Sequence, residues 1–410
     1  MKKMFIVVSA LLLPVSLWAA GLRAPRAPAI SMSGPRVGAY IRTWGMGATQ
    51  EEFDQGVHWT ADQVKGEYLT DLIIAFGLID QNDKTSIYIP DMIDTPSKFR
   101  PGATVPGFKT LWHEVAALKA KYPHLHVSLS VGGYLAEFSD TMADPTLRAR
   151  FIINAMIIVA SHNLDGIDID WEYPVGPDWG SEIKARPEDR ENYLALLMEL
   201  RTALNALSKE TGKRYNLSTA VPASAWFVQK NDVIAAAEIV DSFKLMAYDY
   251  YGGWSGQTGH LANLSNNPAD PDWGGWSTKQ ALDAYLNAGI PANKMMLGIA
   301  FYGRAWSGVQ DGGVNGLYQK YTQSAYPDGL PWPKIKELLQ PGSGFTRYWD
   351  PVAESPFLYN GDVFVTYSDA EAIALIAAYA KEKGLAGIFT WEYAHDINAE
   401  LLQVMAKSGQ

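Results

Sequence analysis

The chain contains no cysteine among its 410 residues. It therefore forms no disulfide, offers no thiolate to a metal ion and has no thiol nucleophile. It also lacks any run of roughly 18 uninterrupted apolar residues, the length that a helix needs to cross a bilayer. These absences exclude thiol chemistry and predict no stable association with a membrane.

Positive charge is also in short supply. Lysine and arginine number 34 against 44 aspartates and glutamates, which gives a formal net charge of -10 at pH 7. A chain this acidic repels nucleic acid and anionic lipid. We therefore expect no nucleic-acid partner and a ligand that is neutral or cationic.

The N-terminus has the pattern of a secretory signal peptide over residues 1–20. Lys2 and Lys3 precede an uncharged apolar run, and small residues follow at Ala19 and Ala20. Cleavage near Ala20 would remove two lysines, change the formal charge from -10 to -12 and leave the protein secreted, in the periplasm or outside the cell. The alternative is a short N-terminal anchor. Residues 21–35, rich in alanine, proline, glycine and serine, are expected to form a flexible lead-in.

Eight short apolar runs follow, with helical patterns between them. Each run is continuously apolar rather than alternating, which is typical of a strand covered on both faces. Eight alternations of strand and helix predict an α/β fold and favour a (β/α)8 TIM barrel over an open sheet. The expected barrel comprises residues 36–304 and 363–410. The runs are RVGAYIRTW, LTDLIIAFGL, LHVSLSVGG, LDGIDIDWE, YNLSTAVPA, DSFKLMAYD, KMMLGIAFYGR and GLAGIFTWE.

Two of the intervening helices have readable boundaries. One should bury a leucine face and end at Gly212. The other should begin with a capping box made by Ser368 and Glu371 and end at Gly384. The leucines of the first helix are Leu197, Leu200, Leu204 and Leu207.

The interval between the seventh and eighth strands is too long for a simple connection. Residues 305–362 are rich in tyrosine and tryptophan, whose side chains need something to cover them. We therefore expect a small α+β insertion on the rim of the barrel rather than a floppy surface loop.

The segment NLDGIDIDWEYP, residues 163–174, carries four acids inside a run that otherwise reads as a buried strand. Side chains alternate along a strand, so Asp168, Asp170 and Glu172 face one way, into the barrel. Asp165 has the opposite parity and is expected to be structural. We call the three inward acids the acid row.

Three ionised carboxylates in a row repel one another. Two like charges about 6 Å apart at an effective dielectric of about 20 repel by roughly 2.8 kcal/mol. We expect at least one proton on the row at neutral pH, and Glu172, nearest the mouth, is placed to deliver it. The alternatives are a satisfied ion-pair network and a divalent metal site. We expect no metal or cofactor, because only His162 lies nearby in sequence and hard cations usually draw oxygen ligands from loops.

The acid row and four other segments closely resemble glycoside hydrolase family 18 chitinases of the bacterial type. DGIDIDWE fits the family signature DxxDxDxE, and SLSVGG resembles its SxGG motif. LMAYD resembles the MxYD motif, GIAFYGRAW the strand-seven YGR element, and GIFTWEY the strand-eight tryptophan. The motifs occur in family order over about residues 37–405. One departure is Tyr134, where many relatives have tryptophan.

The resemblance implies hydrolysis of β-1,4 linkages between N-acetylglucosamine units with retention, in which the substrate supplies the nucleophile. Glu172 would protonate the glycosidic oxygen and later activate water. The substrate acetamide would close an oxazolinium ring. Asp170 would orient that acetamide, Asp168 would share a proton with Asp170, and Tyr248 would hydrogen-bond the carbonyl.

The resemblance also implies a set of sugar-binding side chains. Trp391 would floor the cleavage subsite by stacking on a pyranose ring, and Trp44 and Trp254 are further candidate platforms. For these two, a core position is the alternative, and for Arg304 a structural ion pair is the alternative. The expected binding residues are Tyr40, Trp44, Phe76, Gly133, Tyr134, Met246, Asp249, Trp254, Tyr302, Arg304 and Trp391.

We therefore expect a secreted, monomeric chitinase that acts on chitin or chitooligosaccharides. One alternative is an endo-β-N-acetylglucosaminidase acting on glycoprotein glycans, which the long insertion disfavours because a walled groove suits a linear polymer. The other is a chitin-binding lectin on the same fold, which the presence of Glu172 disfavours.

Overall fold

The computed structural model describes residues 34–43, 59–89, 111–134, 136–176, 184–272 and 276–409, with no account of the side chains at 327 and 328. The predicted signal peptide, nearly all of the predicted lead-in and Trp44 lie outside the described residues.

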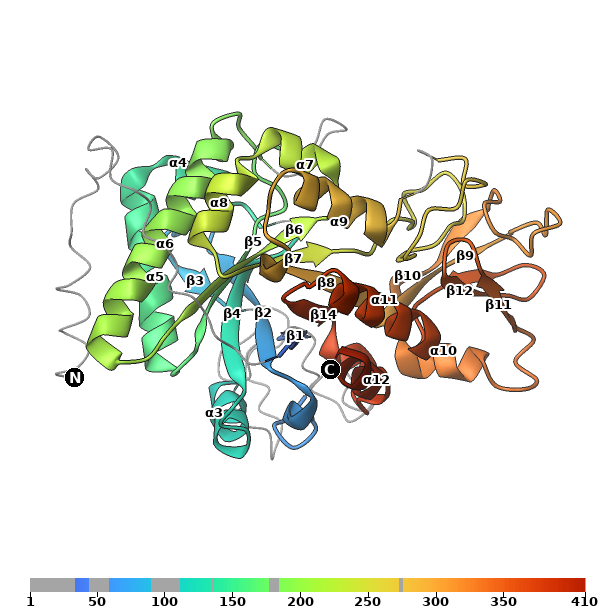
Figure 1. Ribbon diagram of the computed structural model, residues 1–410, viewed down its shortest axis with the longest axis horizontal. Helices are drawn as coiled ribbons and strands as arrows, with labels where there is room; N and C mark the ends of the chain where they lie inside the picture. Colours follow the sequence, from blue (N-terminus) through green and yellow to red (C-terminus); the bar gives the residue numbers. More distant parts are fainter. Residues whose placement is uncertain are drawn as a thin grey trace.

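A closed barrel of parallel strands forms the larger part of the molecule (Figure 1). Its strand order is β1-β14-β8-β7-β6-β5-β4-β2, and pairing of β1 with β2 closes it. Each strand coincides with one predicted apolar run, so the predicted (β/α)8 barrel is confirmed. The strands are β1 (Arg36–Arg42), β2 (Asp71–Ile79), β4 (His126–Gly132), β5 (Gly166–Asp170), β6 (Asn216–Pro222), β7 (Ser242–Met246), β8 (Met295–Ala300) and β14 (Gly387–Trp391). The short β3 (Ile87–Tyr88) pairs antiparallel with β2.

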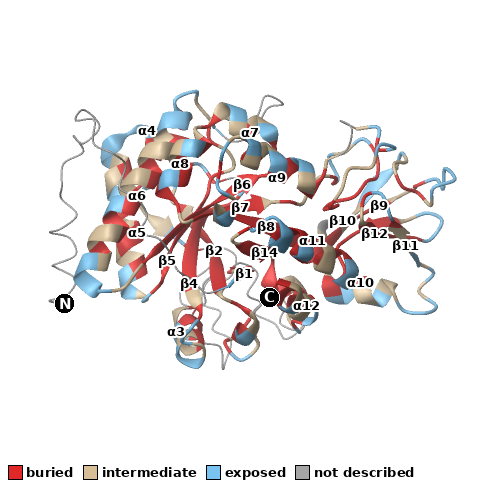
Figure 2. Ribbon diagram, in the orientation of Figure 1, coloured by how far each residue is buried: buried red, intermediate tan, exposed pale blue. Residues whose placement is uncertain are grey.

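Helices cover the outside of the barrel, and Figure 2 shows the strands buried beneath them. Apolar side chains on the outer faces of the strands meet these helices, so strands such as β5 and β6 are buried along their whole length. No helix of the described part of the chain is long and apolar enough to cross a membrane. The helices are α3 (Leu111–Lys121), α4 (Ser139–Ala143), α5 (Pro145–Ser161), α6 (Asp189–Thr211), α7 (Ala225–Lys230), α8 (Val233–Ile239), α9 (Thr278–Asn287), α11 (Ala370–Glu382) and α12 (Glu400–Gly409).

Helix α6 follows its predicted pattern. All four leucines of the predicted face are buried, and the helix ends at Gly212 in the left-handed region, with φ of 71°. The predicted cap of α11 was wrong by one residue. Asp369 caps that helix by accepting hydrogen bonds from the backbone N–H groups of Glu371 and Ala372. The Glu371 carboxylate pairs with Arg347 instead of closing a box with Ser368.

A second, smaller sheet lies beside the barrel, at the right of Figure 1. Its strand order is β10-β9-β13-β12-β11, and every pairing is antiparallel. The sheet runs from Tyr302 to Thr366 and is therefore wider than the predicted 305–362. Its elements are β9 (Tyr302–Ser307), β10 (Gln323–Pro331), α10 (Trp332–Leu338), β11 (Thr346–Asp350), β12 (Ser355–Tyr359) and β13 (Phe364–Thr366).

This insertion has a hydrophobic core of its own. Trp306, Phe357 and Phe364 pack together there with Leu317 and Tyr359. The aromatic side chains that made residues 305–362 unusual in sequence therefore cover one another, so the segment is not a floppy loop.

Candidate active site

The C-terminal end of β4 makes room for the acid row on β5. Gly132 and Gly133 have φ of +128° and +91°, and Gly133 donates a backbone hydrogen bond to the carbonyl of Asp170 at 2.9 Å. A Cβ atom on Gly132 would lie 1.9 Å from that carbonyl oxygen. The SxGG motif is thus required by the close approach of β4 to β5.

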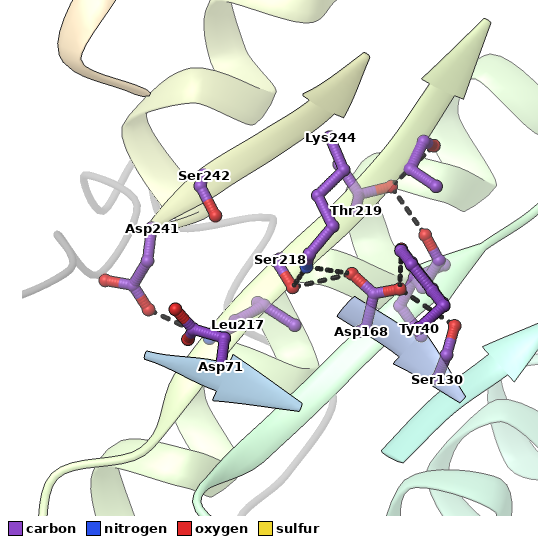
Figure 3. A network of polar contacts seen from close by, with 12 residues as sticks. Tyr40, Asp71, Ser130, Asp168, Leu217, Ser218, Thr219, Asp241, Ser242 and Lys244 are labelled. Atoms are coloured by element: carbon purple, nitrogen blue, oxygen red, sulfur yellow. Dashed lines mark hydrogen bonds and ion pairs between the residues drawn. The ribbon is translucent and has the colours of Figure 1, made fainter. Parts of the chain in front are cut away.

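Asp168 lies in the lumen and is fully buried. Its Oδ2 atom accepts hydrogen bonds from Tyr40 at 2.7 Å and Ser130 at 2.8 Å, and its Oδ1 atom accepts from Ser218 at 2.6 Å and Lys244 at 2.7 Å (Figure 3). Burial alone would raise the pKa of Asp168. The Lys244 ammonium and these hydrogen bonds outweigh burial and lower it.

The pKa of Asp170, the next acid of the row, is shifted in the opposite direction. It is 4% exposed, and among the described residues nothing hydrogen-bonds its Oδ1 atom. Burial raises the pKa of Asp170 well above its usual range, and the carboxylates of Glu172 and Asp168 add to this effect. The prediction that the row holds a proton at neutral pH is consistent with this geometry.

Glu172 follows the end of β5 and is partly exposed. Burial of its carboxyl among protein atoms raises the pKa of Glu172 to about 7, Asp249 adds to the rise, and a hydrogen bond from Tyr173 opposes it. A carboxylic acid that still holds its proton near neutral pH is suited to general acid catalysis.

Asp165 lies outside the lumen, as its parity predicts. It pairs with Lys119 and, at 2.8 Å, with Lys213, and it accepts a hydrogen bond from the backbone N–H of Val127 at 2.8 Å. These contacts join the start of β5 to its neighbours, so Asp165 is structural.

Aromatic side chains form a floor beside the acid row. The rings of Phe76 and Trp391 stack with centroids 5.5 Å apart and planes at 15°. Tyr40 contacts Trp391 at 5.7 Å between centroids. These three rings come from the C-terminal halves of β2, β14 and β1 and belong to one cluster with Met246 and Tyr248.

Tyr248 stands between this floor and the insertion. Its ring packs edge-on against Phe389 and Tyr302, at 6.4 Å and 6.3 Å between centroids. A Cβ atom on Gly298 would lie 2.7 Å from the Tyr248 ring, so this glycine of β8 is what leaves room for it. Burial raises the pKa of Tyr248 well above its usual range, and Asp170 and Asp249 add to the rise, so its hydroxyl remains a donor.

Asp249, Trp254, Tyr302 and Arg304 form a group at the edge of the mouth. The Arg304 Nε atom donates to Asp249 at 2.7 Å, so the structural ion pair that was the alternative for Arg304 is present. The Arg304 guanidinium also lies over the rings of Trp254, at 4.7 Å, and Tyr302, at 5.5 Å.

Two of the predicted binding residues are exposed. Trp254 is 64% exposed and Tyr134 is 68% exposed, which excludes the core alternative for Trp254. The loop that carries Trp254 is tied to the insertion, because the Tyr321 hydroxyl donates to the carbonyls of Gly253 and Ser255. The insertion therefore sets the position of this tryptophan.

The sequence prediction missed Lys244 and Ser218. Lys244 lies in the apolar run of β7, two residues before Met246 and therefore on the same face of the strand. A charged residue of lumen parity inside an apolar strand is the same signal that identified the acid row, so Lys244 could have been found. Ser218 gave no comparable signal, because a serine is common in any strand.

The metal alternative finds no support in the geometry. In the ranges that the structure describes, no group of three or more His, Asp or Glu side chains could hold a metal ion. Against Asp168, the place that a cation would take is filled by the Lys244 ammonium.

Comparison with known proteins places most of the chain in one family. The family model described as "Glycosyl hydrolases family 18" matches residues 36–396. Chitinase A1 of Niallia circulans is 36% identical over 303 residues, which cover 70% of this chain and 43% of that protein. The chain thus spans less than half the length of that curated relative.

Two solved structures share the fold over most of the chain. A family 18 N-acetylglucosaminidase from Paenibacillus barengoltzii is 29% identical, with a TM-score of 0.75 over 92% of this chain and 100% of that one. The catalytic domain of psychrophilic chitinase B from Arthrobacter TAD20 is 26% identical, with a TM-score of 0.79 over 92% of this chain and 95% of that one. The chain belongs to glycosyl hydrolase family 18.

Proposed function

We propose that this protein is a chitinase that hydrolyses β-1,4 linkages between N-acetylglucosamine units with retention of configuration and without an enzyme nucleophile. The observation that supports this most directly is the acid row at the end of β5, which Tyr40 links to the aromatic floor of Phe76 and Trp391.

In the first step, Glu172 gives its proton to the glycosidic oxygen as the bond from that oxygen to C1 breaks. The carbonyl oxygen of the substrate's own acetamide bonds to C1 and closes an oxazolinium ring. Asp170 accepts a hydrogen bond from the acetamide N–H and stabilises the positive charge, and the Tyr248 hydroxyl donates to the acetamide oxygen.

In the second step, the Glu172 carboxylate takes a proton from water. The hydroxide bonds to C1 from the face that the leaving group left, and the oxazolinium ring opens to regenerate the acetamide. Glu172 ends protonated and ready for another cycle. The scheme requires an N-acetyl group on the non-leaving side of the cut.

Replacement of Glu172 by glutamine tests the assignment. Glu172→Gln should lower kcat/KM on an N-acetylglucosamine hexamer by roughly 10^3-fold, because the general acid is lost. Glu210→Gln, at an exposed position in the last turn of α6, is the matched control and should leave turnover unchanged. Early products of the wild-type protein should be the β-anomer by NMR. Unchanged turnover of Glu172→Gln, or an early α-anomer, would overturn the mechanism.

The same assay distinguishes the proposed function from two alternatives, an enzyme with a different substrate and a protein without catalytic activity. Faster cleavage of a high-mannose glycopeptide than of the hexamer would favour an endo-β-N-acetylglucosaminidase. Tight binding of the hexamer without any product would favour a lectin. We expect the hexamer to be cleaved and the glycopeptide to be left intact.

We also propose that the protein is exported and acts as a monomer. The N-terminal residues 1–20 have the charge and size pattern of a signal peptide. N-terminal sequencing of the exported protein should begin near Gly21, and light scattering should give the mass of one chain. An intact N-terminus on a membrane-bound product would contradict the export proposal.

A further inference from the structure

A lysine lies within the barrel lumen against the acid row. Lys244 is 1% exposed, and its Nζ atom donates to Asp168 Oδ1 at 2.7 Å and to the Ser218 hydroxyl (Figure 3). Burying an ammonium group is strongly unfavourable unless it is paired. Its pairing with Asp168 makes the two charges one neutral unit at the base of the row.

The hydrogen bonds to Asp168 leave it no place for a proton. A carboxylate has about four lone-pair sites, and Asp168 accepts from Tyr40, Ser130, Ser218 and Lys244. Each of these groups donates to Asp168. A proton shared between Asp168 and Asp170 would have to displace one of them, so the expectation that the two aspartates share a proton does not fit this arrangement.

The hydrogen bonding of Asp170 differs from that of Asp168. Its buried Oδ1 atom has no hydrogen-bond partner among the described residues, and Glu172 is the next acid toward the mouth. The charge of the Glu172 carboxylate raises the pKa of Asp170. Asp170 therefore has a carboxyl oxygen open to a proton or to a bound substrate, whereas Asp168 has none.

We propose that Lys244 is a positioning residue that holds Asp168 as a fixed carboxylate and so confines the mobile protons of the acid row to Asp170 and Glu172. This inference rests on the proposed function for its catalytic meaning. Lys244 acts through Asp168 and need not touch the substrate.

The other ionisable groups around the row are either neutral or paired elsewhere. The phenols around it stay neutral, because burial raises their pKa well above neutral pH. Asp249 is paired with Arg304, and Arg36 with Asp71. Among the described residues, Lys244 is thus the cation that hydrogen-bonds a member of the row. The phenols are Tyr40, Tyr173, Tyr193 and Tyr248.

Two substitutions should move the pH profile in opposite directions. Lys244→Met removes a positive charge from the row, which then binds protons more tightly. The apparent pKa of the basic limb of kcat/KM on N-acetylglucosamine oligomers should rise by roughly half to one pH unit. Asp168→Asn leaves the charge of Lys244 uncompensated and should lower the apparent pKa of the basic limb. The double variant is neutral again and should return close to wild type.

The signs of these shifts decide the proposal. A folded Lys244→Met protein with an unchanged basic limb would overturn it, and so would an upward shift that persists in the double variant. If Lys244→Met fails to fold, Asp168→Asn is compared with the double variant. The apparent pKa of the basic limb should be lower for Asp168→Asn, and equal values for the two proteins would overturn the proposal.

Infrared titration of the carboxyl groups tests the same point without substrate. Asp168→Asn should remove an ionised carboxylate band near neutral pH and no protonated carboxyl band. Loss of a protonated band would overturn the proposal. A wild-type protein that cleaves no N-acetylglucosamine oligomer would overturn the proposed function alone, because the infrared result would still show whether Asp168 is held ionised.

Discussion

The ring of Phe76 is stacked on the indole of Trp391 because Gly133 has no side chain. A Cβ atom on Gly133 would lie 2.6 Å from the Phe76 ring, and Phe76 lies 5.5 Å from Trp391 between centroids. A glycine of the SxGG motif therefore controls the aromatic floor formed by side chains of β2 and β14.

Gly133→Ala should disturb both folding and substrate binding. The left-handed φ of +91° and the clash with Phe76 together should lower the free energy of unfolding by about 3 kcal/mol. Gly361→Ala is a matched control, since its φ is +96° and a Cβ there meets no atom within 4 Å. In Gly361→Ala, the free energy of unfolding should fall by about 1 kcal/mol, and KM should stay unchanged. Urea unfolding and KM measurements check this, and equal losses in the two variants would refute the role of the clash.

The pH dependence of hydrolysis should follow the acid at the mouth. Because the pKa of Glu172 is raised to about 7, the protonated form that catalysis requires is lost as pH rises through that value. The basic limb of kcat/KM should therefore have an apparent pKa near 7. A limb near the ordinary glutamate value would show that another group supplies the proton.

Glu172→Gln should stabilise the fold at high pH. The pKa of Glu172 is raised from 4.5 to about 7 on folding, so the folded state binds the extra proton and wild-type stability falls as pH rises between those values. Above about pH 7, glutamine should add about 1–2 kcal/mol, an amount reduced for the partial exposure of Glu172. Below pH 4.5 the two proteins should unfold alike. Thermal unfolding across this pH range, with Glu210→Gln as control, measures the difference.

Asp165→Asn should weaken the fold and leave the pH profile of catalysis unchanged. The pKa of Asp165 is lowered: Lys119 and Lys213, with a backbone N–H, outweigh the effect of burial. Its stabilisation is present above the unfolded-state pKa of about 3.9 and disappears as pH falls below that value. We expect a loss of about 1–3 kcal/mol at pH 7. A shifted basic limb in this variant would contradict its assignment as structural.

Trp254→Ala should impair binding but not folding. Trp254 is 64% exposed, so its removal should raise KM for an N-acetylglucosamine tetramer about 5- to 10-fold with little change in unfolding temperature. Trp349→Ala is the matched control, because Trp349 also lies beneath an arginine, Arg347, at 5.5 Å, but on edge strand β11 of the insertion. Equal KM changes in the two variants would show that Trp254 is not a specific platform.

The barrel and its acid row were predictable because both depend on local patterns. Strands buried on two faces are continuously apolar, and the two-residue period separates Asp168 and Asp170 from Asp165 without knowledge of their neighbours. The cap of α11 was not predictable to the residue, because Ser368 and Asp369 are both good caps. The choice between them depends on Arg347, which pairs with Asp369 and Glu371 from another strand.

By itself, the sequence determined the number of barrel strands and the direction in which the acid row points. Only the tertiary structure decided how the charges of the row are shared. Lys244 is 76 residues from Asp168 in sequence and meets it inside the lumen. The pKa of a buried carboxyl depends on which groups surround it in space, and closure of the barrel selects those groups.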